Sequence, residues 1–266
     1  MPFLSARGAD LFYTDAGDGQ QTLLFVHGTA CDTHDWDGQL AHFARRHRVI
    51  AVDLRGHGRS SAPEGGYDAK DLAEDLAQVV QALDCGPVIA FGHSLGGILV
   101  SLLAVEHPDL VQALVCVDPG YLVPDDRLEM VEGAFASVRD NPRSAMTAMF
   151  ESLDSPATPA EHRQEHIRRI EDLPGHVIIE TMHNYIWAMR SASEPFLRRR
   201  TCPVLTIHSD VDRIDLERQL LVDPRSRAIT WSPAGHWLHQ ERPDDFHELV
   251  DDWLRDLEEA SPSARR

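Results

Sequence analysis

Ser94 lies between two glycines, and this pattern is typical of a catalytic serine. Residues 92–96 are Gly-His-Ser-Leu-Gly, directly after the apolar run 88–91 and at the start of a helical pattern. In a sharp strand-to-helix turn, side chains at the flanking positions would collide, and the serine is held in a strained conformation that exposes its hydroxyl. Ser94 is therefore the candidate nucleophile.

Two later segments carry groups that could activate this hydroxyl. A serine needs a base within hydrogen-bond reach, and the base needs a group that orients it. His236 follows the last predicted strand, so it would lie at the same sheet edge as Ser94. Asp212 follows the strand predicted over 204–208, and the order Ser94, Asp212, His236 is that of nucleophile, acid and base.

The strands and helices that must position these residues are predicted to alternate along the chain. Continuous apolar runs predict strands buried on both faces, as in a parallel sheet covered by helices. The predicted strands are 11–13, 22–26, 48–53, 88–91, 114–117, 204–208 and 228–231, and the predicted helices are 35–46, 69–83, 95–106 and 243–257. The alternation indicates an α/β doubly wound fold, with the opening segments as a hairpin edge.

Residues 122–200 break this rhythm. They hold six prolines and helical patterns but no convincing strand. We expect residues 1–121 and 201–266 to form the core domain and residues 122–200 to form a helical lid, or cap, over the carboxyl edge of the sheet. Ligands bind at that edge in open α/β sheets.

A stripe of large side chains lies within this insertion. Met182 and Tyr185 belong to it, and Trp187 is nearby. Together with Trp237, which follows His236, we expect them to line an apolar substrate pocket. The alternative is that the stripe only packs on the core.

Four segments together resemble the α/β-hydrolase fold superfamily, in particular its serine esterases and lactonases. They are His-Gly-Thr-Ala at 27–30, Asp-Leu-Arg-Gly-His-Gly-Arg-Ser at 53–60, the serine turn, and Gly-His-Trp-Leu at 235–238. The resemblance covers nearly the whole chain and implies a mostly parallel sheet, helices on both faces and a helical lid. It also implies an oxyanion hole formed by the backbone N–H groups of Thr29 and Leu95.

The resemblance bears on the choice of acid as well. Similar proteins often carry Gly-x-x-Asp after the strand that ends here at 208, and Ser209 takes the place of that glycine. This spacing points to Asp212, with Asp210 and Asp215 as close rivals. Other family members place the acid after the preceding strand, where this chain has Asp118, so Asp118 is the alternative acid.

Several other histidines have simpler interpretations. His27, His57 and His93 flank the site, and we expect them to tie loops together by hydrogen bonds. His162 and His166 fit an HxxEH zinc pattern, but the segment is polar and offers no third ligand. We interpret it as a solvated helix and expect no metal.

The composition excludes several classes of partner. A formal net charge of -18 argues against nucleic acid, whose binding rests on Lys and Arg, and against an anionic membrane surface. No stretch approaches the roughly 20 apolar residues of a membrane span, and the N-terminus lacks a signal-peptide pattern. The four cysteines are scattered without a CxxC pair, which suits a reducing compartment. We expect a cytoplasmic protein that acts on a small molecule without a cofactor.

The resulting hypothesis is hydrolysis of a carboxylic ester or lactone of a small apolar substrate through an acyl-enzyme. Four alternatives stay open: C–C bond hydrolysis of a ring-cleavage diketone, a cofactor-free oxygenase, a perhydrolase, and a slow-turnover small-molecule receptor. An oxygenase would keep much of its activity in Ser94→Ala, and a receptor would bind tightly with negligible turnover.

Overall fold

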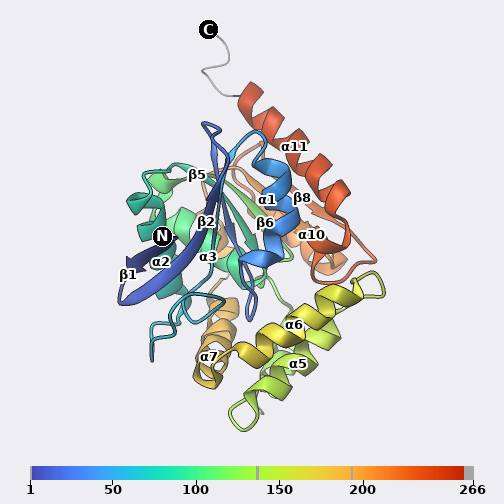
Figure 1. Cartoon of the computed structure of the whole chain (residues 1–266). Coiled ribbons are helices and arrows are strands. Elements are labelled where there is room, and N and C mark those ends of the chain that lie inside the picture. Colours follow the sequence, from blue (N-terminus) through green and yellow to red (C-terminus); the bar gives the residue numbers. More distant parts are fainter. Residues whose placement is uncertain (1, 136–137, 193, 261–266) are drawn as a thin grey trace.

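One sheet organises the computed structural model, which describes residues 2–135, 138–192 and 194–260 (Figure 1). Its strand order is β1-β2-β4-β3-β5-β6-β7-β8. The strands are β1 (Phe3–Ala6), β2 (Ala9–Ala16), β3 (Thr22–Val26), β4 (Arg48–Val52), β5 (Val88–His93), β6 (Val111–Val117), β7 (Val204–His208) and β8 (Arg227–Thr230). The pairs β1–β2 and β2–β4 are antiparallel and all later pairs are parallel. The predicted mostly parallel sheet with a hairpin edge is confirmed.

The strands follow the apolar pattern closely where both faces are buried. β3 and β7 coincide with the predicted ranges 22–26 and 204–208. β2 is longer than the predicted 11–13 because it lies near the sheet edge, where polar residues such as Asp10 and Asp15 can face water. The polar residues at the two ends of β2 interrupt the apolar run, so the run predicts only the middle of this strand.

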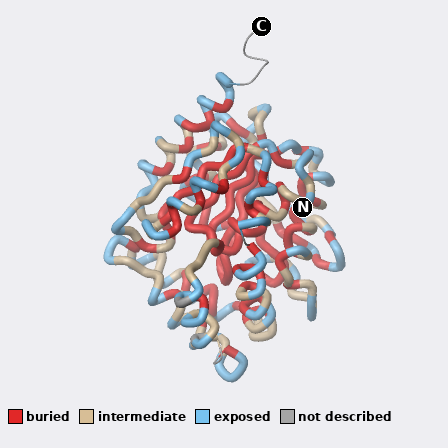
Figure 2. The backbone as a smooth tube through the Cα atoms, turned by 180° about the vertical axis from the view of Figure 1, so that it is seen from behind, coloured by how far each residue is buried: buried red, intermediate tan, exposed pale blue. Residues whose placement is uncertain are grey.

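Both faces of the sheet are covered by helices. Leu23 and Phe25 of β3 point into one hydrophobic cluster, which contains Trp253 of α11 (Pro243–Glu259). Leu24 and Val26 point into the other cluster, formed with α2 (Ala69–Ala82) and α3 (Leu95–Glu106). This alternation is the period-two geometry of a strand, and the central strands accordingly form the buried interior in Figure 2.

Shorter elements complete the core. The predicted helix 35–46 is a 3-10 turn followed by a short helix α1, on the same face as α11. The short elements are η1 (Thr33–Trp36), α1 (Asp37–Phe43), η2 (Pro108–Leu110), η3 (Val211–Arg213), α9 (Ile214–Leu220) and α10 (Leu238–Glu241).

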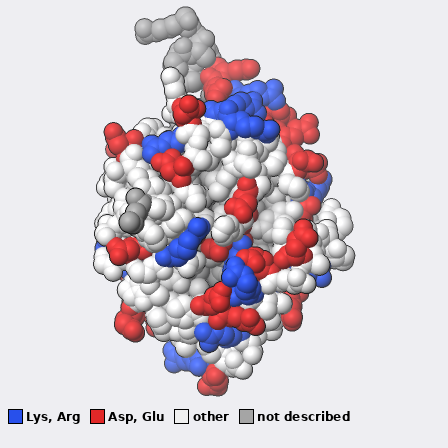
Figure 3. Space-filling model, in the orientation of Figure 1, with Lys and Arg blue, Asp and Glu red and all other residues white. Residues whose placement is uncertain are grey.

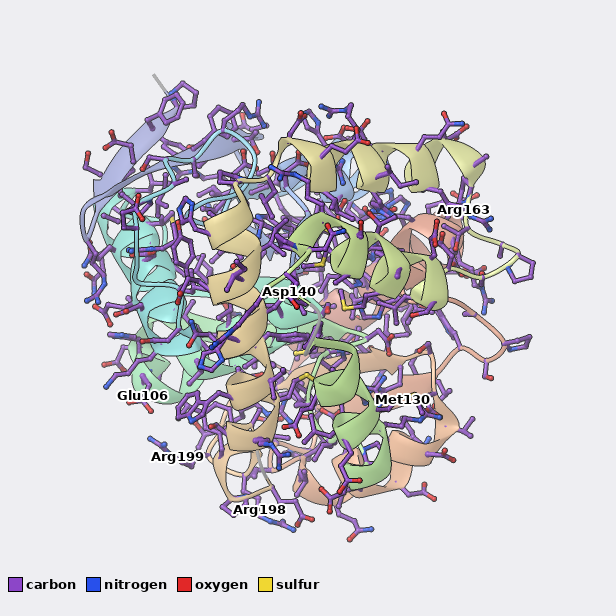
Figure 4. All side chains as sticks on the ribbon, turned by 90° about the horizontal axis from the view of Figure 1, so that it is seen from below. Glu106, Met130, Asp140, Arg163, Arg198 and Arg199 are labelled. Carbon is purple, nitrogen blue, oxygen red and sulfur yellow. The ribbon has the colours of Figure 1, made fainter. Side chains whose placement is uncertain are left out.

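The predicted helical insertion lies between β6 and β7. In its described part it holds α4 (Asp125–Phe135), α5 (Pro142–Leu153), α6 (Ala160–Asp172), α7 (Gly175–Ser191) and α8 (Glu194–Leu197), which we call the cap. Figure 1 shows α5, α6 and α7 together below the sheet, and Figure 4 shows the cap crossing that end. Met130 of α4, labelled in Figure 4, is 72% exposed on the outer side.

Helix α6 is not the freely solvated helix expected from its polar sequence. His166, Arg169 and Ile170 are buried. Arg169 forms ion pairs with Asp35 and Asp32, which lie in the segment after β3. A buried charge therefore joins the cap to the core, and the expectation of a fully solvated helix is wrong for this face.

The surface carries charged side chains of both signs. Acidic and basic side chains are interspersed over the face seen in Figure 3. Among the helices described by the structure, none combines the length and apolar character needed to cross a membrane.

Candidate active site

Ser94 occupies the sharp turn between β5 and α3. Its backbone has φ 53° and ψ -114°, a conformation that non-glycine residues rarely adopt. A Cβ at Gly92 would overlap the Gly96 carbonyl, and a Cβ at Gly96 would overlap the Val26 carbonyl. The turn is therefore possible only with glycine at both positions, as the sequence predicts.

His236 is held by its backbone and by its ring. The backbone N–H donates to the Leu153 carbonyl at 3.1 Å, and the His236 carbonyl accepts from His93 Nε2 at 3.0 Å. The ring Nδ1 lies 2.6 Å from Asp118 Oδ2. Because Nδ1 is engaged by this carboxylate, Nε2 is the ring nitrogen left for proton transfer.

Asp118 follows β6 and is fixed by partners in the segment after the neighbouring strand β7. Its carboxylate accepts from the Ser209 N–H at 3.1 Å and the Ser209 hydroxyl at 2.9 Å. Arg213 donates to its Oδ1 atom at 2.6 Å. Burial raises the pKa of Asp118, but Arg213 and the His236 and Ser209 hydrogen bonds lower it more, so the net pKa lies well below the ordinary value. The carboxyl is therefore ionised at neutral pH.

The backbone of Asp118 is also unusual. Its φ of 38° lies in the left-handed region, which costs energy for a residue with a side chain. Ser94 and Asp118 thus both carry local strain that the surrounding fold must offset. Such strain clusters at functional sites.

Asp212, the preferred acid of the sequence analysis, lies elsewhere. Its side chain is 65% exposed and faces Arg127 of α4 at 3.9 Å. The 3-10 turn η3 leaves Asp212 in solvent while Arg213 is buried against Asp118. The structure therefore brings the alternative acid, Asp118, to His236, and it does not bring Asp212 there.

A cavity of about 260 Å³ opens over these groups. Ser94, Asp118 and His236 line it, together with Gly28 and Thr29. Its apolar walls come mainly from the cap and include Val123, Val131, Phe135, Met149, Phe150 and Met189. Within the described residues Ser94 Oγ makes no hydrogen bond to His236; its partner is the Tyr185 hydroxyl at 3.2 Å.

The predicted oxyanion-hole amides lie beside this serine. Leu95 is the first residue of α3, where backbone N–H groups have no partner within the helix. In the described part of the chain neither the Leu95 nor the Thr29 amide donates a hydrogen bond. A Cβ at Gly28 would come within 3.1 Å of Ser94 Cβ, so the Gly28–Thr29 segment approaches the nucleophile closely.

The predicted pocket residues separate into two groups. Tyr185 and Trp237 line the cavity. Met182 is buried in the core cluster instead, as the packing alternative expected. Trp187 is 60% exposed and lies outside the cavity lining, so its expected pocket role is wrong. Residues 182, 185 and 189 share one face of α7, and residue 187 lies on the opposite face.

The flanking histidines tie loops together as expected. His27 Nε2 accepts from the Leu54 N–H at 3.0 Å, and His57 Nδ1 donates to the Arg55 carbonyl at 2.9 Å. His166 stacks on Trp237 with ring centroids 4.2 Å apart, and burial lowers its pKa to about 4. Over the residues that the structure describes, no group of three or more His, Cys, Asp or Glu side chains is placed to hold a metal ion.

Sequence reasoning missed the groups that orient the acid. Arg213 and Ser209 both contact Asp118, but neither has a sequence signature of that role. Their only signal was position, because they follow the strand next to β6.

Two curated proteins share part of this sequence. A non-heme haloperoxidase from Rhodococcus erythropolis is 42% identical over 109 residues, which cover 40% of this chain and 39% of the relative. A 2-(acetamidomethylene)succinate hydrolase from Mesorhizobium japonicum is 36% identical over 110 residues, covering 41% of this chain and 40% of the relative. The chain thus matches about two fifths of the length of each relative.

Solved structures and a family model cover more of the chain. Est816, described as an N-acyl homoserine lactone degrading enzyme, superposes with a TM-score of 0.80 at 24% identity over 94% of this chain and 99% of its own. At that identity the likeness shows the fold alone. The family model described as alpha/beta hydrolase fold matches residues 21–243. The chain therefore belongs to the alpha/beta hydrolase fold family.

Proposed function

We propose that this protein hydrolyses a carboxylic ester or lactone through an acyl-enzyme, with Ser94 as nucleophile, His236 as base and Asp118 as acid. One observation carries the proposal. The His236 imidazole is fixed by Asp118 at 2.6 Å and shares a cavity with a serine held in a strained, glycine-framed turn. A nucleophile, a base and an orienting carboxylate are the parts that acyl transfer requires.

The steps follow from these positions. Ser94 Oγ attacks the substrate carbonyl carbon while His236 takes the hydroxyl proton. The carbonyl oxygen becomes negative and is held by the Thr29 and Leu95 amides, each of which is worth about 3–4 kcal/mol of the barrier. The bond from the acyl carbon to the leaving oxygen then breaks, and His236 gives the proton to that oxygen. Water, deprotonated by His236, next attacks the acyl carbon, the bond to Ser94 Oγ breaks, and the carboxylic acid leaves. Asp118 stabilises the charged imidazole, because its low pKa keeps the carboxylate ionised.

The cavity limits the substrate. Its volume of about 260 Å³ lies below the roughly 300–1,000 Å³ of drug-sized ligand sites. Its walls are mostly apolar side chains of the cap. Both features favour a small substrate with an apolar acyl or ring group.

The test is a panel of p-nitrophenyl esters and lactones assayed on wild type and Ser94→Ala. The variant should lose at least about 10³-fold in rate, because the nucleophile is gone. A serine-reactive organophosphate should label Ser94, as located by peptide mass spectrometry, and abolish turnover. Activity that persists after complete labelling would refute the mechanism.

The haloperoxidase match favours perhydrolysis as a second candidate. In this reaction hydrogen peroxide replaces water as the nucleophile that releases the acyl group, and the product is a peracid. With hydrogen peroxide, a carboxylic acid and bromide all added, the peracid should oxidise the bromide with wild type but not with Ser94→Ala. If Ser94→Ala still oxidises bromide, this activity does not proceed through an acyl-enzyme at Ser94.

A further inference from the structure

The Tyr185 hydroxyl contacts the proposed nucleophile. It lies 3.2 Å from Ser94 Oγ and comes from α7 of the cap, whereas Ser94 belongs to the core. Tyr185 is buried and lines the cavity. A cap side chain therefore reaches the atom that would form and break the covalent bond.

The fold leaves a space that this hydroxyl fills. Gly120 follows β6, and a Cβ there would overlap the Tyr185 hydroxyl and its ring edge. The Gly120 N–H also donates to the Ser94 carbonyl at 3.1 Å. The backbone that supports the serine thus also makes room for the tyrosine.

The direction of this hydrogen bond depends on the state of the serine. In the free protein either hydroxyl can donate to the other. In an acyl-enzyme, Ser94 Oγ is an ester oxygen without a proton, so only Tyr185 can donate. Burial raises the pKa of Tyr185 above its ordinary value of 10, so its proton is present at neutral pH.

We propose that Tyr185 is a catalytic residue of the deacylation step, where its hydroxyl stabilises Ser94 Oγ as the departing oxygen. This inference rests on the proposed acyl-enzyme mechanism. Water attacks the acyl carbon and His236 takes one water proton. The bond between the acyl carbon and Oγ then breaks, and His236 delivers that proton to Oγ. Tyr185 keeps its own proton throughout and supplies only a hydrogen bond to the oxygen on which charge develops.

Pre-steady-state kinetics of Tyr185→Phe with p-nitrophenyl acetate test this role. The first burst of p-nitrophenol reports acylation, and the steady-state rate reports deacylation once the acyl-enzyme accumulates. We expect the steady-state rate to fall by about 10- to 100-fold, as for a lost hydrogen bond to a charged group. The burst rate should change by less than about threefold, and mass spectrometry should find acetylated Ser94 at steady state.

Two further variants separate this role from a structural one. Tyr67→Phe removes another phenol hydroxyl, which donates to the Pro63 carbonyl at 2.6 Å, and it should leave both rates within about twofold of wild type. Gly120→Ala should displace the Tyr185 hydroxyl and reproduce the loss of deacylation, which keeps the test decisive if Tyr185→Phe does not fold.

The outcomes are distinct. Unchanged deacylation in Tyr185→Phe, an equal loss of both rates, or the same split in Tyr67→Phe would overturn the role of Tyr185 while leaving the acyl-enzyme intact. A wild-type protein that never acylates Ser94 would instead refute the proposed function itself.

Discussion

The Nδ1 atom of His236 lies 2.6 Å from the Oδ2 atom of Asp118, a residue 118 positions earlier in the chain, at the end of β6. Ser209 and Arg213, which follow the neighbouring strand β7 in the chain, bind the same carboxylate. In the proposed mechanism β6 therefore provides the acid, and the segment after β7 holds that acid in place.

Asp118→Asn should lower kcat on an ester substrate by about 10⁴-fold, because an amide no longer selects the imidazole tautomer that accepts the serine proton. Asp212→Asn should keep kcat within about twofold, because the Asp212 side chain is exposed and faces Arg127. Steady-state kinetics on both variants, with melting curves to verify folding, decide the matter. The reverse pattern would restore Asp212 as the acid.

Arg169→Met should lower the free energy of unfolding by about 3–5 kcal/mol, because it leaves the fully buried carboxylate of Asp35 without its cation. Urea unfolding measures the loss. Arg168→Met is the matched control, since Arg168 is an exposed neighbour on the same helix, and it should leave the unfolding midpoint unchanged. The double variant Arg169→Met/Asp35→Asn should recover part of the lost free energy of unfolding, because it removes the unpaired carboxylate. If it recovers nothing, the unpaired charge of Asp35 is not the cause of the loss.

His166→Phe should reduce the dependence of stability on pH. Burial lowers the pKa of His166 from 6.5 to about 4, so the unfolded chain binds more protons between these values. The free energy of unfolding therefore falls as pH drops from 6.5 towards 4, and this residue accounts for a loss of the order of 3 kcal/mol. Phenylalanine preserves the stacking on Trp237 but does not titrate.

Urea unfolding at several pH values between 7 and 4 provides the measurement for this variant. His183→Phe at an exposed position of α7 is the matched control for the change of side chain itself. The effect of His166→Phe on the slope is compared with that of this control. An equal slope in His166→Phe and wild type would show that His166 does not contribute.

Met189→Ala should shift the acyl preference towards longer chains, because it enlarges the cavity next to Ser94. Each additional methylene buried there should improve kcat/KM by about fourfold relative to wild type. Trp187→Ala, two residues away on the exposed face of α7, should leave the preference unchanged. A p-nitrophenyl ester series tests both variants, and a shift in Trp187→Ala would return that residue to the substrate pocket.

Local patterns in the sequence were sufficient for the buried central strands and the serine turn. Continuous apolar runs predicted β3 and β7 to the residue, because strands buried on both faces need apolar side chains in succession. The glycines around Ser94 were equally predictable, because their requirement arises from backbone collisions within a few residues and the strand beside them.

Only the tertiary structure decided which acid meets His236 and which cap residues face the cavity. Asp118 and Asp212 both follow strands that are neighbours in the sheet, so strand order cannot distinguish them. The turn η3 places Arg213 inward and leaves Asp212 in water. Likewise, helical periodicity grouped Met182 with Tyr185, but the packing of α7 over Gly120 selected Tyr185 to contact Ser94. Contacts between distant segments depend on how the elements pack, and no local pattern contains that information.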